Sequence, residues 1–199
     1  MKIPEIEKIQ KRIANTCIGP STLRNQGAKG VIPKARKYLS TDLDLCKLKD
    51  INCDKDFIIW LNTETNKLKG ELPPGAQNWG TARKALNVFL EEAFYNRFLT
   101  KYYSIDKIEA FLEIPLDTNT FDGLKNDKDS NKIDDFPKLK WKGIKYLSRE
   151  ESEPLQDYAL KLSKVKGISR IYLDLDYWRS TEQQDDQEMK INPSPCRVS

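Results

Sequence analysis

Residues 78–103 read NWGTARKALNVFLEEAFYNRFLTKYY, and this stretch carries the strongest helix signal in the chain. Thr81 can cap the N-terminus of the helix, and strong helix formers follow for some twenty residues without glycine or proline. Apolar side chains cover more than half of the circumference of such a helix: Ala85, Leu86, Phe89, Leu90, Ala93, Phe94 and Leu99. An element that packs on several sides has this pattern. The stretch therefore predicts a long central helix in a mainly α protein.

Shorter helical patterns lie on both sides of this stretch. Apolar residues at spacings of three and four, together with glycine and proline boundaries, predict helices at about residues 3–13, 31–39, 55–68, 105–111 and 154–165. Pro115 breaks the chain after the fourth of these helices, and Asp117 or Thr118 can cap a further helix. The fold class is therefore mainly α.

The C-terminal part of the chain is less regular. Residues 125–136 are charged and almost free of apolar side chains, which predicts a mobile surface loop. Residues 170–178 (RIYLDLDYW) alternate between apolar and polar, as in one short strand, with a helix as the alternative. The polar residues 181–199 predict a disordered tail. We expect a single helical domain over residues 1–180.

Composition limits the classes of protein that this chain can represent. Its 199 residues are enough for one hydrophobic core, and 38% hydrophobic with 32% charged residues is normal for a soluble protein. No apolar run approaches the roughly 20 residues of a membrane span, and the first residues, MKIPEIEKIQ, are too charged for a signal peptide. The sequence thus predicts a cytoplasmic protein without a membrane partner.

The chain contains no histidine, and its cysteines lack metal-binding spacing. The cysteines are Cys17, Cys46, Cys53 and Cys196, and we expect them to be reduced and mostly buried. Zinc sites of the usual kinds and triads that depend on imidazole are excluded. Any acid–base or nucleophilic chemistry must therefore come from Asp, Glu, Lys, Tyr or an amino terminus.

Basic residues gather in two parts of the chain. They are Lys29, Lys34, Arg36 and Lys37 in the first part and Lys138, Lys140, Lys142 and Lys145 in the second. The net charge is only +4, but Asp185, Asp186 and Glu188 lie in the tail, so the body is more basic than the whole chain. This distribution favours a nucleic-acid partner.

Two segments together resemble a known family. They are GTARKALNVFL (80–90), which contains Lys84, and EIPLDTNTFDGL (113–124), in which Asp117 follows Pro115. The pair resembles the helix-hairpin-helix DNA glycosylases, in which an aspartate that opens a helix follows a lysine-bearing helix. The separation of 33 residues is similar to that in the archaeal 8-oxoguanine glycosylase branch. The resemblance covers about residues 75–124, where LPPGAQNWGTARKA (72–85) replaces the family's compact glycine hairpin.

The resemblance implies an orthogonal helical bundle of the glycosylase type. It also implies a monomeric DNA glycosylase, with AP-lyase activity as a further possibility, that excises a damaged or modified base from double-stranded DNA. In this role Lys84 attacks C1′ of the sugar, and Asp117 stabilises the positive charge that develops there. No cofactor and no metal are required.

Several residues are candidates for DNA contact. They are Arg24, Lys29 and Lys34 in the basic loop and Trp79, Gly80, Thr81 and Arg83 at the start of the central helix. Backbone N–H groups at a helix N-terminus can bind phosphate, and an aromatic ring can stack on an extruded base. The aromatic residue that lines the base pocket is left open among Trp60, Trp79, Trp141 and Trp178.

Two other functions remain open at this point. A helical protein that binds nucleic acid without catalysis would keep its DNA affinity when Lys84 and Asp117 are replaced. A metal-dependent nuclease could use Asp174 and Asp176, with Glu113 as a further ligand, and chelators would inactivate it. The non-catalytic alternatives for single residues are an N-cap for Asp117, a surface position for Lys84 and solvent exposure for Asp174 and Asp176.

Overall fold

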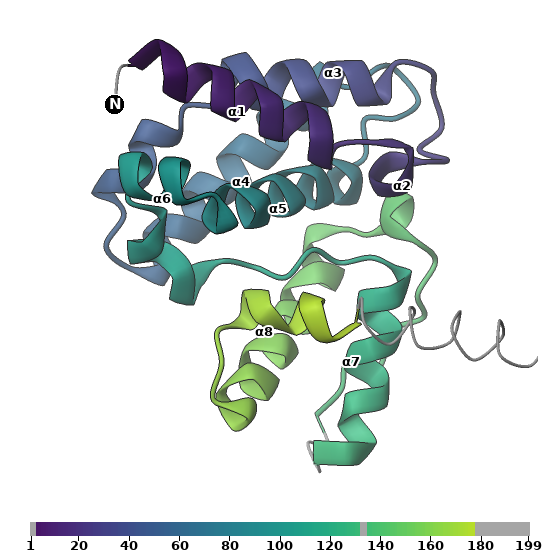
Figure 1. Cartoon of the computed structure of the whole chain (residues 1–199). Helices are drawn as coiled ribbons and strands as arrows, with labels where there is room; N and C mark the ends of the chain where they lie inside the picture. The colour runs from purple at the N-terminus through teal and green to yellow at the C-terminus, as the bar shows by residue number, and fades with distance from the viewer. Residues whose placement is uncertain (1–2, 132–134, 178–199) are drawn as a thin grey trace, which may run out of the picture.

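A computed structural model of the chain describes residues 3–131 and 135–177, and every regular element in these two ranges is helical (Figure 1). The α-helices are α1 (Ile3–Cys17), α2 (Pro20–Leu23), α3 (Val31–Lys37), α4 (Asp54–Glu71), α5 (Trp79–Tyr95), α6 (Arg97–Tyr103), α7 (Thr118–Asn131) and α8 (Arg149–Lys166). A π-helical turn, η1 (Tyr38–Asp42), and the 3₁₀ helices η2 (Leu45–Asp50), η3 (Ile105–Phe111), η4 (Ile144–Tyr146) and η5 (Arg170–Tyr172) complete the set. The prediction of a mainly α fold is confirmed. None of the described helices is long and apolar enough to cross a membrane.

The predicted central helix is present, but it starts earlier and is divided in two. α5 begins at Trp79, so the prediction that Thr81 is the N-cap is wrong. Thr81 is fully buried, and its hydroxyl donates to Oε1 of Gln26 at 2.7 Å. At the other end the side chain of Asn96 accepts hydrogen bonds from the backbone N–H groups of Phe98 and Leu99. This local cap ends α5 and starts α6.

Residues 170–177 form helical turns, and the prediction of a strand there is wrong. A strand would place Leu175 on the same face as Ile171 and Leu173. The structure instead buries Ile171 and Leu173 and leaves Leu175 43% exposed. Tyr177, four residues after Leu173, is buried again, as helical periodicity requires.

The loop predicted at residues 125–136 is helical over most of its length. α7 continues to Asn131, and residues 132–134 lie outside the described ranges, as does the predicted tail at residues 181–199. Asp127 on this helix accepts hydrogen bonds from Lys166 at 2.7 Å and from the Tyr177 hydroxyl at 3.1 Å. These contacts hold a polar segment against α8, although it contributes little apolar surface.

α8 starts five residues before the predicted position. Ser148 and Glu151 form a reciprocal capping box, which satisfies backbone N–H groups at the helix start. Pro154, which the sequence placed at the beginning, therefore lies inside the helix. The prediction that the thiols are mostly buried is wrong for Cys46 and Cys53, which are exposed, and Cys196 lies outside the described residues.

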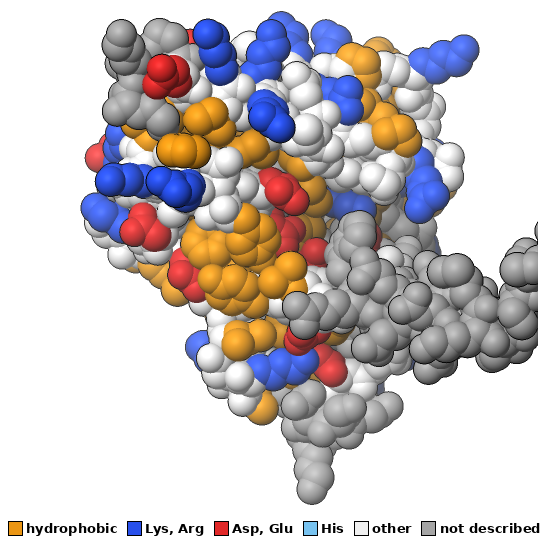
Figure 2. Space-filling view, in the orientation of Figure 1, with side chains coloured by type: hydrophobic (Ala, Val, Ile, Leu, Met, Phe, Trp, Pro, Cys, Tyr) orange, Lys and Arg blue, Asp and Glu red, His pale blue; other side chains and the backbone are white. Residues whose placement is uncertain are grey.

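The buried side chains form two clusters that meet beside α5. The first cluster lies among α1, α3, α4, α5 and α6 and includes Ile171, and the second lies between α7, α8 and residues 173–177. Figure 1 shows α7 and α8 on one side of the layer that contains α5 and α6. Figure 2 shows the molecular surface in the same orientation, with a patch of hydrophobic side chains near the centre of the view and Lys and Arg side chains spread over its upper part. Trp141 packs against both clusters.

Candidate functional site

Lys84 lies near the start of α5, in a part of the helix that is buried on all sides. Every residue from Gly80 to Asn87 is buried, and Lys84 is only 8% exposed. A lysine rarely occupies such a position unless its ammonium group has a partner. The alternative that Lys84 is a surface residue is therefore wrong.

Asp117 is the partner of Lys84. Lys84 Nζ lies 2.9 Å from Asp117 Oδ2, and the side chain of Asp117 keeps 34% of its surface exposed. The other carboxylate oxygen, Oδ1, accepts a hydrogen bond from the backbone N–H of Thr120 at 2.9 Å. Asp117 therefore caps α7 and neutralises Lys84 at the same time. The N-cap alternative is correct for one oxygen but does not account for the other.

The electrostatic environment keeps Asp117 ionised. Burial by itself would raise the pKa of this carboxyl, because it removes water from the charged form. The positive charge of Lys84 and the hydrogen bonds from Lys84 and Thr120 outweigh burial and lower the pKa below its usual value. The site therefore contains a fixed negative charge next to an amine.

The peptide segment before Asp117 is held by side chains from two helical elements, η5 and α8. Arg170 donates hydrogen bonds to the carbonyl oxygens of Phe111 at 2.7 Å and of Leu112 at 3.0 Å. Gln156 on α8 donates to the carbonyl oxygen of Ile114 at 2.8 Å. The extended backbone is thus fixed on both sides of Glu113.

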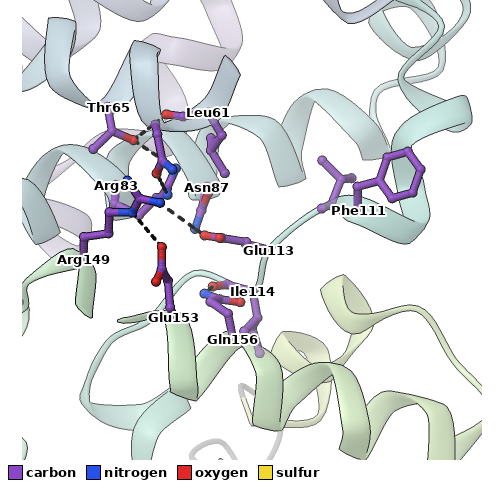
Figure 3. Close-up of polar contacts among 12 residues, drawn as sticks. Leu61, Thr65, Arg83, Asn87, Phe111, Glu113, Ile114, Arg149, Glu153 and Gln156 are labelled. Atoms are coloured by element: carbon purple, nitrogen blue, oxygen red, sulfur yellow. Dashed lines mark hydrogen bonds and ion pairs between the residues drawn. The ribbon is translucent and has the colours of Figure 1, made fainter. Parts of the chain in front are cut away.

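Glu113 itself is anchored to α5. Figure 3 shows Arg83, Asn87 and Glu113 pointing toward one another between α5 and the segment that leads to Asp117. Arg83 Nε lies 3.4 Å from Glu113 Oε2, which also accepts a hydrogen bond from Asn87 at 3.0 Å. Arg83 also donates to Thr65 on α4 at 3.1 Å. This network sets the position of Asp117 relative to the helix that carries Lys84.

Lys84 and Asp117 line one cavity of about 610 Å³. It is lined by Ser21, Thr22, Arg24, Asn25, Gln26, Lys84, Asp117, Thr118, Asn119 and residues 142–146. Four of its lining residues are basic: Lys84, Arg24, Lys142 and Lys145. Asp117 is the only acidic one among the described lining residues. A cavity of this size and charge can admit an anionic group the size of a nucleotide.

Two further carboxyl groups lie behind Asp117. Asp174 Oδ1 lies 3.2 Å from the hydroxyl of Thr120, the residue whose backbone contacts Asp117. Burial and the negative charge of Asp117 raise the pKa of Asp174 to about 6. Burial, together with Asp174 and Glu92, raises the pKa of Glu91 to about 9. Both groups hold a proton far more readily than carboxyls in water.

Asp174, Asp176 and Glu113 do not form the metal site that the nuclease alternative requires. Glu113 is paired with Arg83 and Asn87, and Asp176 lies 3.5 Å from Lys166. Asp174 contacts Thr120 instead of Asp176. Within residues 3–131 and 135–177 there is no group of three acidic or cysteine side chains that could hold a metal ion. The geometry therefore gives no support to the nuclease alternative.

The structure separates the predicted DNA-contact residues into two groups. Arg24 lines the cavity, and Lys29 and Lys34 are exposed outside it. Gly80, Thr81 and Arg83 are buried against protein atoms, so we correct the prediction that they contact DNA. A Cβ atom on Gly80 would lie 2.2 Å from the carbonyl oxygen of Ile144, which explains why this position is closed to a ligand.

The tryptophans do not line the cavity where the structure describes them. Trp60 is buried, the ring of Trp79 lies 4.6 Å from the Arg83 guanidinium, and Trp141 stacks on Phe121 at 5.1 Å. Trp178 lies outside the described residues. The lining residues that sequence reasoning missed are mainly Gln26 and Tyr146. Neither belongs to a motif, although Tyr146 follows Lys142 and Lys145 in a stretch already noted as basic.

Comparisons of the chain with protein-family models, with curated proteins and with solved structures found no match.

Proposed function

We propose that this protein is a DNA glycosylase with AP-lyase activity, in which Lys84 is the nucleophile and Asp117 is its carboxylate partner. The observation that carries the proposal is the 2.9 Å contact between Lys84 Nζ and Asp117 Oδ2 at the wall of a solvent-accessible cavity. The two residues are 33 positions apart, and an elaborate network of buried side chains holds them together. A purely structural ion pair does not need an opening of this size.

The pair suits the cleavage of an N-glycosidic bond. Lys84 is a cation in its pair with Asp117, so its ammonium group first gives one proton to water in the cavity. The resulting amine forms a bond to C1′ while the glycosidic bond breaks and its electron pair leaves with the base. One proton of the attacking nitrogen neutralises the departing base, and the proton held by water returns to the ring oxygen when the sugar ring opens to a protonated imine. Asp117 remains ionised because of its lowered pKa, so it can stabilise the positive charge on the sugar during bond cleavage.

The charge of the cavity wall favours DNA as the substrate. Arg24 and Lys142 are exposed at the cavity, and neither forms an ion pair with a described residue. Unpaired basic side chains around a cavity attract phosphates and give sequence-independent affinity. A target nucleotide would have to leave the duplex to reach Lys84, because a base in the helical stack cannot enter a cavity.

Borohydride trapping on a duplex with a single abasic site tests the lyase step without knowledge of the base. We expect a covalent adduct with the wild-type protein, and its cross-linked peptide should contain Lys84. Lys84→Gln should form no adduct, whereas Lys107→Gln, a change at an exposed residue on η3, should form it normally. An adduct of equal yield in Lys84→Gln would contradict the proposal.

Base release tests the glycosylase step. A panel of duplexes, each with one damaged or modified base, should contain at least one substrate from which the wild-type protein frees the base in the presence of EDTA. The competing proposal of a non-catalytic nucleic-acid-binding protein requires DNA affinity without adduct or base release. It also requires that Lys84→Ala and Asp117→Ala leave this affinity nearly unchanged.

A further inference from the structure

Tyr146 is a large aromatic side chain that stands in solvent on the wall of the Lys84 cavity. It is 62% exposed, the highest value among the exposed large hydrophobic residues that the structure describes. It is also the only aromatic residue among the described residues that line this cavity. An exposed ring at the mouth of an otherwise polar and basic cavity is available for a ligand.

The backbone around Tyr146 is rigidly attached to the rest of the protein. Its neighbours Ile144 and Leu147 are 8% and 6% exposed, so the 3₁₀ turn η4 is fixed by buried residues on both sides of the ring. Gly80 lets this turn approach α5 so closely that a Cβ atom there would overlap the Ile144 carbonyl oxygen. The turn starts at Gly143, whose φ of 94° favours glycine. The ring is therefore presented from a fixed position.

The same segment is also attached to the helix that Asp117 caps. The indole N–H of Trp141 donates to the hydroxyl of Thr118 at 3.1 Å, and its ring stacks on Phe121. Thr118 directly follows Asp117. The segment that carries Tyr146 and the carboxylate of Asp117 are therefore both attached to the start of α7. Their relative position depends on packed side chains and does not require a ligand.

We propose that Tyr146 is the stacking platform for the everted base of the substrate, while Arg24 and Lys142 bind the phosphates of the same strand. This inference rests on the proposed function and names how its substrate is held. Aromatic rings stack on the face of any base, and the neighbouring cations supply the electrostatic attraction that stacking lacks. The ammonium group of Lys145 lies over one face of the Tyr146 ring, 5.6 Å from its centre, so the base would stack on the opposite face.

Equilibrium binding to two uncleavable duplexes tests the platform. One duplex carries an unpaired 2′-fluoroarabino thymidine, and the other carries a tetrahydrofuran abasic analogue at the same position. The wild-type protein should bind the first duplex more tightly, because only the first can supply a base. Tyr146→Ala should weaken binding to the first duplex about 5- to 100-fold, the range expected for the loss of one stacked base, and should change binding to the second less than about twofold.

Conservative and remote variants separate stacking from other effects. Tyr146→Phe keeps the ring and should preserve the preference for the first duplex. Phe98→Ala removes another exposed aromatic ring, which lies outside the cavity, so it should leave both affinities unchanged. Equal weakening on both duplexes in Tyr146→Ala, or loss of the preference in Tyr146→Phe, would overturn the proposal.

The outcome does not depend on the chemical step. If the wild-type protein shows the preference and Tyr146→Ala abolishes it, the platform is supported even when borohydride traps no adduct. If Tyr146→Ala retains the full preference while the wild-type protein forms the Lys84 adduct, the glycosylase proposal stands and the platform is wrong.

Discussion

The hydroxyl of Thr120 lies 3.2 Å from Oδ1 of Asp174, so the last described helical turn contacts the first turn of α7 beside the Lys84–Asp117 pair. The same hydroxyl is 2.9 Å from the carbonyl oxygen of Pro115, and it has only one hydrogen to donate. The hydroxyl therefore shares its hydrogen between Pro115 and Asp174, and its bond to Asp174 lowers the pKa of that carboxyl. Burial and the negative charge of Asp117 outweigh this bond and raise the pKa of Asp174 to about 6.

Asp174→Asn should make the protein more stable above pH 6. The pKa of Asp174 is raised from 3.8 to about 6 in the folded protein, so ionisation of this carboxyl opposes folding. Below about pH 4 it is protonated in both the folded and the unfolded state, and the stabilising effect of the raised pKa is fully present there. As the pH rises from about 4 to above 6, the free energy of unfolding therefore falls by about 2 to 3 kcal/mol.

Urea unfolding of the wild type and of Asp174→Asn between pH 4 and 8 measures this difference. The advantage of the variant should grow as the pH increases. Asp176→Asn, on the same helical turn but exposed, should keep the pH dependence of the wild type. A constant difference between wild type and Asp174→Asn over this pH range would show that the carboxyl is not perturbed.

Asp117→Asn should separate DNA binding from catalysis. The amide can still cap α7, because asparagine is as good an N-cap as aspartate, but it carries no negative charge for the sugar. We expect base release to fall by about 100-fold or more, with DNA affinity retained. Single-turnover base release and equilibrium binding on the same duplex measure both quantities. Undiminished base release would remove Asp117 from the mechanism.

Gly80→Ala should destabilise the protein strongly. The added methyl group would lie 2.2 Å from the backbone oxygen of Ile144 and 2.8 Å from Cβ of Leu147, so α5 and the turn of Tyr146 must move apart. Overpacking of this kind costs about 1–3 kcal/mol or more. Gly70→Ala is the matched control, because it lies in α4 with no atom within 4 Å and should be neutral or stabilising. Thermal unfolding distinguishes the two variants.

Arg170→Met should weaken both stability and adduct formation. The guanidinium of Arg170 donates to three backbone carbonyls, those of Phe111, Leu112 and Gln156, and the side chain is only 4% exposed. Loss of these buried hydrogen bonds should lower the free energy of unfolding by about 3 kcal/mol or more. Arg149→Met breaks only an exposed pair with Glu153 and should cost less than about 1 kcal/mol. A similar cost for both variants would argue against a clamp at Arg170.

The helices that the sequence predicts best are those in which a long apolar stripe has helical spacing. Residues 3–13 are an example, since Ile3, Ile6, Ile9 and Ile13 are spaced three and four apart and lie inside α1 at Ile3–Cys17. The sequence predictions are wrong where a short local feature determines a helix boundary. Such features are the Asn96 cap inside the predicted central helix and the Ser148–Glu151 capping box before Pro154. At residues 170–177 the apolar pattern is too short to distinguish a strand from a helix, and burial of Leu173 and Tyr177 with Leu175 exposed decides for a helix.

The amino-acid sequence alone specified a mainly helical chain without histidine chemistry, because periodicity, capping and residue type act over a few neighbouring positions. Lys84 and Asp117 became candidates through the resemblance of their two segments to a known family. The contact between those two side chains, the burial of Arg83 and Thr81, and the position of Tyr146 at the cavity depend on segments that are far apart in the chain. Such contacts follow from how side chains fill the space between helices, and a linear pattern carries no measure of that space.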